Sequence, residues 1–426
     1  MKTYFHLDSI LVLIIVITYI GSNYLQPLFV VIVGPGLIEY VGRFLGLALF
    51  AILSLKRDFL IHFKRYLAYL YLVILVWLLA ILYATLYISN QDLGLAMSNL
   101  FNILSTCITY IIFSYLCERD EKLSLYIFWA LCLFAAINIS IGIYGTLTGQ
   151  NLLGERARDN IAIGVGAFGF DESTGRSGGI RGENYVGLWT SPLLTLLLFE
   201  ILGRRWLVAC FLLSVVASGL ATSFSRTTYI SSLFIFLIFI IIVLRNKANW
   251  HRIVLIFLSL ILLIIFVSKA LDQQLLFTNE YVYKSGIERL LTDNRTHVWK
   301  EWLEVFFQYP FGIGPGQVSN YVQISIQLIP HNSLLSVAVE YGVFGLFLYM
   351  VPFIVAYRSS RWLFKCNNYD SLLAMQVASF WGMVVSLIFL SNPFLKIVFL
   401  LAGCIEGRKQ FFIYRKGITK NLSQYK

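Results

Sequence analysis

The chain has 426 residues, of which 58% are apolar and only 13% are charged, and its mean hydropathy is +0.76. This composition excludes a soluble globular protein and predicts an integral membrane protein that crosses the bilayer many times. The formal net charge of +11 does not require nucleic acid as a partner, because basic residues gather in the cytoplasmic loops of membrane proteins.

Charge-free segments long enough to cross a bilayer recur along nearly the whole chain. A hydrocarbon core of about 30 Å needs roughly 20 apolar residues in a helix, and every backbone amide in such a segment needs a partner inside it. We therefore expect helices in the following runs: Ile10–Val33, Tyr66–Ser89, Met97–Leu116, Leu123–Leu147, Trp206–Phe224, Thr227–Leu244, Ile253–Ser268 and Ser371–Leu390.

Four further segments complete an expected set of about twelve transmembrane helices. Leu37–Leu55, Tyr185–Leu202 and Asn332–Tyr357 each contain one or two charged residues, and Pro393–Ile405 is a short apolar stretch around Lys396. The expected fold class is therefore an all-α integral membrane protein.

Basic residues predict the orientation of these helices. They fall in alternate short loops and in the C-terminal tail, in the ranges 56–65, 119–122, 204–205, 245–252, 358–365 and 408–426. The positive-inside rule assigns these loops and both termini to the cytoplasm. The first span lacks the cleavage pattern of a signal peptide and is too long for one, so we expect it to be retained. None of the six cysteines then lies in an external loop, which argues against disulfides and cysteine metal sites.

This topology divides the chain into five parts. Residues 1–147 hold helices one to five, residues 148–184 form a first periplasmic loop, and residues 185–268 hold helices six to nine. Residues 269–330 form a large periplasmic loop, and residues 331–426 hold the last three helices and a basic cytoplasmic tail. Long loops usually have a function, so the two periplasmic loops are the expected place for a site.

Polar motifs lie in and beside these two loops. The first loop contains GRSGGIRGEN, from Gly175 to Asn184. The second contains DNRTHVW from Asp293 and YPFGIGPG from Tyr309, and it is followed by HNSLLSVAVEYGVFG from His331. Residues that can bind an anion and move a proton thus sit at the mouth of a membrane domain, which indicates chemistry on a lipid-anchored substrate.

These motifs resemble those of the O-antigen ligase and polymerase superfamily of bacterial inner membranes. The resemblance rests on SFSRT (Ser223–Thr227) at a helix start, on Arg295 and Trp299 before a proline and glycine turn, and on a His-Asn pair with Glu340 and Gly342 downstream. It covers the C-terminal half, and the N-terminal half matches only in hydropathy. It implies a periplasmic glycosyltransferase, active in surface polysaccharide or lipopolysaccharide synthesis, whose donor is a glycan linked to undecaprenyl pyrophosphate.

Three arginines are candidates for binding the pyrophosphate. Arginine receives phosphate oxygens bidentately and does not titrate. Arg226 lies at the start of a helix, whose dipole also attracts anions, although an interfacial arginine can instead snorkel to lipid head groups. Arg295 is supported by the family pattern, although singly it reads as a solvated charge. Arg181 is a third candidate, with Arg176 as its rival.

His331 is the candidate general base. An imidazole that titrates near pH 6.5 can take the proton of an acceptor hydroxyl as it attacks the anomeric carbon. Asn332 is expected to cap the helix that follows, and Glu340 to orient a neighbouring helix. The competing interpretation makes His331 only a helix cap at the membrane surface, and His297 is the other histidine expected on the external side.

We expect no cofactor and no metal site, because the chain has no P-loop, no Asp-x-Asp pair and no HExxH motif. A metal-independent, inverting transfer follows, with arginines supplying the positive charge. The acceptor is a second lipid-linked glycan in a polymerase and lipid A-core in a ligase, and we favour the polymerase. The family also admits a chain-length regulator as a partner, besides membrane lipids. A lipid-linked glycan flippase is the alternative from another class of protein, since about twelve helices with few buried charges also describe a transporter.

Overall fold

The structure is a computed structural model, and most of the chain is described in it. The described residues are 14–21, 35–88, 91–148, 169–171, 176–179, 186–203, 205–223, 226–245, 295–321, 329–366, 371–390 and 393–424, with isolated residues between 254 and 269. They are helical apart from connecting segments and one small antiparallel pair of strands, β1 (Gly169–Asp171) and β2 (Arg176–Gly179). This pair lies in the predicted first loop and is an addition to the expected all-α fold.

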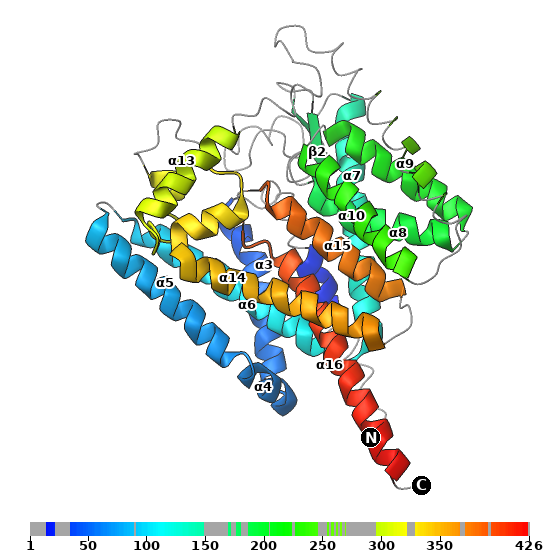
Figure 1. The fold of residues 1–426 in the computed structure, drawn as a ribbon, viewed down its shortest axis with the longest axis horizontal. Coiled ribbons are helices and arrows are strands. Elements are labelled where there is room, and N and C mark those ends of the chain that lie inside the picture. The colour runs from blue at the N-terminus through cyan, green and yellow to red at the C-terminus, as the bar shows by residue number, and fades with distance from the viewer. Residues whose placement is uncertain are drawn as a thin grey trace. The chain divides into compact units, whose positions relative to one another are not determined.

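The chain divides into two compact units, each assembled from segments far apart in the sequence. Unit 1 comprises Met1–Leu45, Leu125–Thr292 and Phe364–Ser386, and unit 2 comprises Gly46–Ser124, Asp293–Leu363 and Leu387–Lys426. The colours of Figure 1 follow the chain through its elements. The five sequential parts predicted above describe membrane topology, and their boundaries stay predictions.

Helices occupy nearly all of the expected apolar runs. They are α3 (Pro35–Ser54), α5 (Leu67–Tyr87), α6 (Leu93–Arg119), α7 (Glu121–Thr148), α8 (Val186–Leu202), α9 (Trp206–Ser223), α10 (Arg226–Arg245), α14 (Ser333–Cys366), α15 (Ser371–Leu387) and α16 (Lys396–Gln424). The run 10–33 is described only at residues 14–21, and the run 253–268 only at isolated helical residues. The last run was predicted to end at Ile405, but α16 continues through the basic tail to Gln424.

Four of the described helices are long and apolar enough to cross a membrane: Leu67–Tyr87, Leu93–Arg119, Glu121–Tyr144 and Ser333–Cys366. Five shorter apolar helices accompany them. The described residues therefore confirm a multi-pass helical membrane protein, while the count of about twelve spans stays a prediction.

In unit 1, α8 packs on α9 and α10, and β2 lies against α9. Gly187 of α8 lies so near the start of α10 that a Cβ atom at this position would be 2.8 Å from the Cα of Thr228. Thr195 of α8 also shares a hydrogen bond of 2.7 Å with Ser379 of α15. Small and hydroxylated residues thus allow close helix contact, as is usual between helices in membranes.

In unit 2, α6 and α16 form the most extensive helix pair. Gly403 and Gly407 of α16, a G-x-x-x-G spacing, face the backbone of Tyr110 and Ser114 of α6. The hydroxyl of Tyr110 donates a hydrogen bond to Glu406. Because glycine has no side chain, the two backbones can approach closely, and van der Waals packing then holds them together. Lipid tails are as apolar as the helix surfaces, so the hydrophobic effect does not drive this association.

Replacement of Gly403 by alanine should lower the thermal stability of the purified protein, because the new Cβ would meet the backbone oxygen of Tyr110. Overpacking of this kind costs about 1–3 kcal/mol. The measurement is the unfolding temperature in detergent. Gly203→Ala is the matched control, since a Cβ there would only reach ordinary contact at 3.5 Å. Equal unfolding temperatures for the two variants would contradict this account of the helix pair.

Candidate functional site

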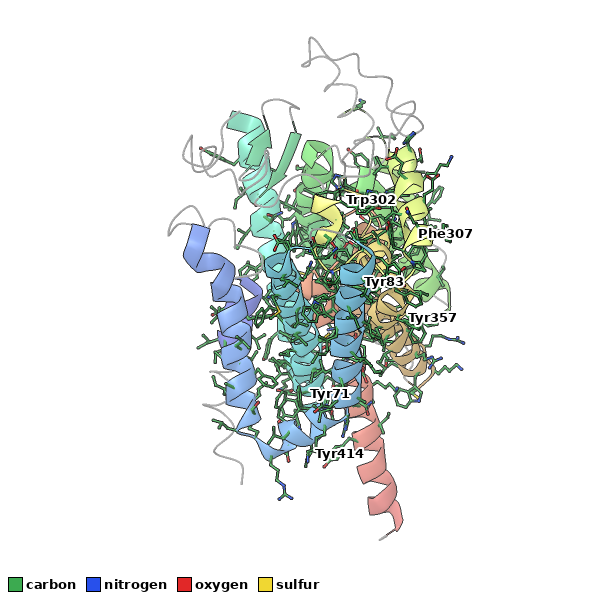
Figure 2. The ribbon with its side chains drawn as sticks, turned by 90° about the vertical axis from the view of Figure 1, so that its left-hand side faces the viewer. Tyr71, Tyr83, Trp302, Phe307, Tyr357 and Tyr414 are labelled. Carbon is green, nitrogen blue, oxygen red and sulfur yellow. The ribbon has the colours of Figure 1, made fainter. Side chains whose placement is uncertain are left out.

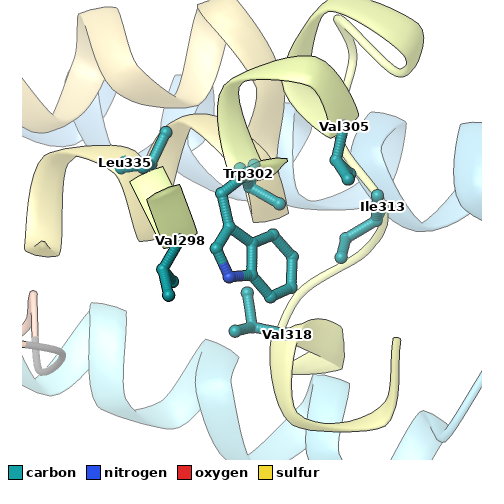
Figure 3. Packing of buried hydrophobic residues seen from close by; sticks show 7 residues of the cluster. Val298, Trp302, Val305, Ile313, Val318 and Leu335 are labelled. Atoms are coloured by element: carbon teal, nitrogen blue, oxygen red, sulfur yellow. The ribbon is translucent and has the colours of Figure 1, made fainter. Parts of the chain in front are cut away.

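An amphipathic helix within the predicted large loop organises one end of unit 2. This helix, α13 (Arg295–Gln308), directs Val298, Trp302 and Val305 into a buried apolar cluster. Trp302 is only 1% exposed. The other members of the cluster come from the turn after α13 and from the start of α14: Ile313, Val318, Leu335 and Val339. Figure 3 shows the Trp302 ring among these side chains. Hydrophobic burial therefore fixes α13, the turn and the start of α14 together.

The turn after α13 is the proline and glycine motif Tyr309–Gly316. Its backbone enters the left-handed region at Gly312, Gly314 and Gly316, with φ of 103°, 104° and 75°. Side chains are strongly disfavoured at such angles. A short 3₁₀ helix, η3 (Gln317–Asn320), follows directly. The glycines thus let the chain reverse tightly between two helical segments.

The same turn supplies hydrogen-bond partners at a break in α14. The helix is interrupted at Gly342, where φ is 68° and ψ is −168°. The carbonyl oxygen of Val339 accepts a hydrogen bond of 2.8 Å from Ile313 N, and that of Glu340 accepts one of 3.2 Å from Gly314 N. A broken helix loses backbone hydrogen bonds, and burial makes that loss costly. The turn supplies partners for the carbonyl groups that the break leaves.

The exchange also runs in the opposite direction. Val343, the first residue after the break, donates its N–H to the carbonyl oxygen of Pro310 at 2.9 Å. A Cβ at Gly342 would collide with the backbone of Phe311. Backbone hydrogen bonds between the turn and α14 therefore fix the position of the turn along this helix.

Glu340 anchors the far end of the turn. Its carboxyl group is buried and accepts backbone hydrogen bonds from Gly316 and Val318. These N–H groups belong to the start of η3, where a carboxylate is a favourable cap. Glu340 was expected to orient a neighbouring helix, and its carboxyl group instead binds the glycine turn and the start of η3.

Two glutamines that the sequence did not single out hold the turn from the other side. Gln91, in the connection from α5 to α6, donates to the carbonyl oxygen of Ile313 at 3.1 Å. Gln317 accepts from Asp92 N at 3.3 Å and donates to Asp92 O at 3.0 Å. Gln317 is 3% exposed. A glutamine in a loop carries no sequence signal for such a role, because the pairing joins residues 225 positions apart.

His331 occupies a fixed position immediately before α14. It is the single residue other than glycine with positive φ in the described part of the chain, at 44°. Asn332 caps the helix as expected, because its side-chain oxygen accepts from Leu334 N at 3.0 Å and from Leu335 N at 3.1 Å. A left-handed backbone conformation at a residue other than glycine costs about 1–3 kcal/mol, and it persists only where the surrounding structure enforces it. The half-buried imidazole of His331 is thus carried on a constrained backbone.

The start of α13 lies beside this segment. The indole N–H of Trp299 donates to the carbonyl oxygen of Pro330 at 2.6 Å. Arg295 is the first residue of α13 and lies one helical turn before Trp299 in the sequence. The fold therefore brings the segments of Arg295 and His331 together. His297 lies on the exposed side of α13, and its Nδ1 is 3.3 Å from a carboxylate oxygen of Glu301.

The other candidate arginines belong to unit 1. Arg226 is the first residue of α10, as the sequence predicted, and Arg176 begins β2. Arg181 lies outside the described residues. The assembly of Arg226 or Arg181 with Arg295 and His331 into one site stays a prediction.

A pair of tyrosines adds polar groups next to the cluster. Tyr321, which follows η3, hydrogen-bonds with Tyr309, and its ring centroid lies 6.1 Å from that of Trp302. Burial raises the pKa of the Tyr321 phenol, and the bond with Tyr309 raises it further. The phenol therefore stays neutral near pH 7 and can donate a hydrogen bond, but it is a poor general base.

Part of the chain matches a known protein family. Residues 193–350 match the model of a family described as O-antigen ligase. This segment of the chain is therefore similar to that family. The matched segment includes Arg226, Arg295, His331 and Glu340, whereas Arg181 lies outside it. No curated protein matches the chain. The resemblance stated from the motifs is thus confirmed over residues 193–350.

Replacement of Glu340 by glutamine should loosen the turn, because the amide group offers one acceptor oxygen where the carboxyl group offers two to the N–H groups of Gly316 and Val318. Loss of one buried hydrogen bond costs about 1–3 kcal/mol. Hydrogen exchange followed by mass spectrometry should show faster exchange in the peptide that covers residues 312–320. Glu304→Gln, an exposed change on α13, is the control. Unchanged exchange in Glu340→Gln would remove the anchoring role.

Proposed function

We propose that this protein polymerises lipid-linked repeat units of a surface polysaccharide by inverting glycosyl transfer from undecaprenyl pyrophosphate. The observation that carries the proposal is the constrained His331, held beside the start of α13 by the bond from Trp299 to Pro330. Both segments fall within the part of the chain that matches the O-antigen ligase family.

The proposed reaction is a direct displacement. A hydroxyl oxygen of the acceptor glycan attacks the anomeric carbon of the donor sugar as the bond from that carbon to the pyrophosphate oxygen breaks. The hydroxyl proton passes to the imidazole of His331, and undecaprenyl pyrophosphate leaves with its electron pair. Arg295 and Arg226, with Arg181 as a further candidate, would stabilise the negative charge on the leaving group. No nucleotide and no metal ion takes part in this scheme.

The surroundings of His331 suit a general base. A base works only when it is held within hydrogen-bond reach of the proton that it removes, and the fixed backbone before α14 limits where the imidazole can lie. His297, in contrast, is exposed and faces Glu301 on the outer side of α13. These contacts favour His331 over His297 as the residue that moves the proton.

Ligation to lipid A-core is the second candidate, since the matched family is described as O-antigen ligase and its match does not distinguish the two reactions. Polymerase and ligase would share the donor and the base and would differ only in the acceptor. Purified protein offered a radiolabelled donor with either a second lipid-linked glycan or lipid A-core would distinguish them, because one acceptor alone should become longer. The location of the site on the periplasmic face of the inner membrane, and a chain-length regulator as a partner, belong to the same proposal.

Alanine in place of Arg226 or Arg295 should abolish transfer while the protein still accumulates in the membrane. Lysine should restore little activity, because it lacks the planar guanidinium that binds two phosphate oxygens. The assay is transfer from purified undecaprenyl-pyrophosphate glycan in proteoliposomes. Lys300→Ala, an exposed charge on α13, is the control and should transfer at the normal rate. Near-normal rates in both arginine-to-alanine variants would exclude these residues from the pyrophosphate site.

Alanine in place of His331 should lower the transfer rate by roughly 10²-fold or more, the usual contribution of a general base. Binding of the donor should persist, because the imidazole is proposed to act on the acceptor hydroxyl. The assay includes a chelator and no nucleotide. A His331→Ala enzyme that works normally while His297→Ala is inactive would show that the base is misassigned. If the chelator alone stops the wild type, the metal-independent scheme is wrong.

A further inference from the structure

The helix α13 has an exposed apolar edge that its buried cluster does not explain. Leu303 is 43% exposed and Phe307 is 75% exposed. They are four residues apart and therefore lie on one side of the helix. The neighbouring edge of α13 carries the exposed polar residues His297 and Glu304, and the exposed Lys300 lies at the border between the two edges. Thus α13 has three sides: one buried in the protein, one apolar and open, and one polar and open. Figure 2 shows Phe307 on the outer side of α13 and Trp302 on its inner side.

The open apolar edge continues onto surfaces that belong to transmembrane helices. Phe311, just beyond α13, is 46% exposed and stacks on Phe344 of α14, with ring centroids 5.9 Å apart and an interplanar angle of 27°. Phe344 and Phe311 line an apolar groove of about 340 Å³ together with Tyr83 and Tyr87 of α5. Both α5 and α14 are among the helices that are long and apolar enough to cross a membrane. An exposed apolar surface on such helices faces lipid.

The direction of α13 fits this continuity. In Figure 1 α13 is drawn at a large angle to α5 and close to one end of it. This orientation is compatible with a helix in the plane of the membrane surface. One apolar edge and one polar edge are what a helix in that plane requires.

We infer that α13 lies in the lipid–water interface, with Leu303 and Phe307 inserted into the bilayer, His297 and Glu304 in water, and Lys300 at the level of the head groups. The partner is the lipid surface itself, because the apolar edge is continuous with the lipid-facing surface of α5 and α14. Such helices bury their apolar side about 5–10 Å into the head-group and acyl boundary. The placement would also set Arg295 at the depth of lipid phosphates. The role of Arg295 in pyrophosphate binding at that depth rests on the proposed function, whereas the placement of α13 does not.

Depth-dependent quenching tests the inference in the full-length protein. Single cysteines are placed at Leu303 or Phe307 and labelled with an environment-sensitive fluorophore. The parent carries serine at Cys210 and Cys366, which are exposed, and the other four cysteines are buried. Glu304→Cys serves as the water-facing control, and Phe347→Cys, 65% exposed on α14, serves as the lipid-facing control. The labelled proteins are placed in nanodiscs of phosphatidylglycerol and phosphatidylethanolamine.

The probes at Leu303 and Phe307 should lose fluorescence to lipids that carry a nitroxide near the glycerol end of the acyl chain. They should be protected from aqueous iodide relative to the probe at Glu304. Iodide quenching equal to that at Glu304 would put the edge in water and overturn the inference. Protection from both quenchers would overturn it in favour of a protein partner, such as a second copy of the chain. The measurement needs no substrate, so its outcome is independent of whether transfer activity is found.

Discussion

Satisfaction of backbone hydrogen bonds at the break in α14 is the constraint on which the rest of the site depends. A helix interrupted at Gly342 inside a membrane protein leaves carbonyl and N–H groups without helical partners. The turn between Pro310 and Gly314 supplies those partners through three backbone bonds. The carboxyl group of Glu340, two residues before the break, accepts backbone hydrogen bonds at the start of η3. Neither the broken helix nor the turn would be stable without the other.

The position of the proposed catalytic groups follows from this pairing. The turn that follows α13 is fixed to α14 by backbone hydrogen bonds. The cluster around Trp302 then packs α13 against the start of α14. The bond from Trp299 to Pro330 then connects α13 with the residue before His331. The left-handed backbone of His331 lies between this bond and the cap formed by Asn332. Rigid support of this kind is what general-base chemistry requires, since small displacements reduce the rate steeply.

The two ends of unit 2 are stabilised by different means. Between α6 and α16 the glycines at 403 and 407 permit close backbone contact, and association relies on packing and on the hydrogen bond between Tyr110 and Glu406. Around α13 the cluster of Trp302 and its neighbours buries apolar side chains away from water. Water is the relevant solvent only outside the bilayer. The proposed interfacial position of α13, between a lipid-facing edge and a water-facing edge, accords with this change of solvent.

Much of the molecule could be predicted from the sequence, because the bilayer imposes strong local rules. Apolar runs predicted most of the helices, Asn332 was identified as a helix cap, and the order of motifs indicated the family. The sequence could not predict the break at Gly342, because a glycine within an apolar run is equally compatible with a continuous helix. Gln317 and Gln91 were missed for a related reason, since their partners are more than 200 residues away along the chain. Local composition fixes which segments are helical, whereas bonds between distant backbones decide where a helix breaks and which side chains face each other.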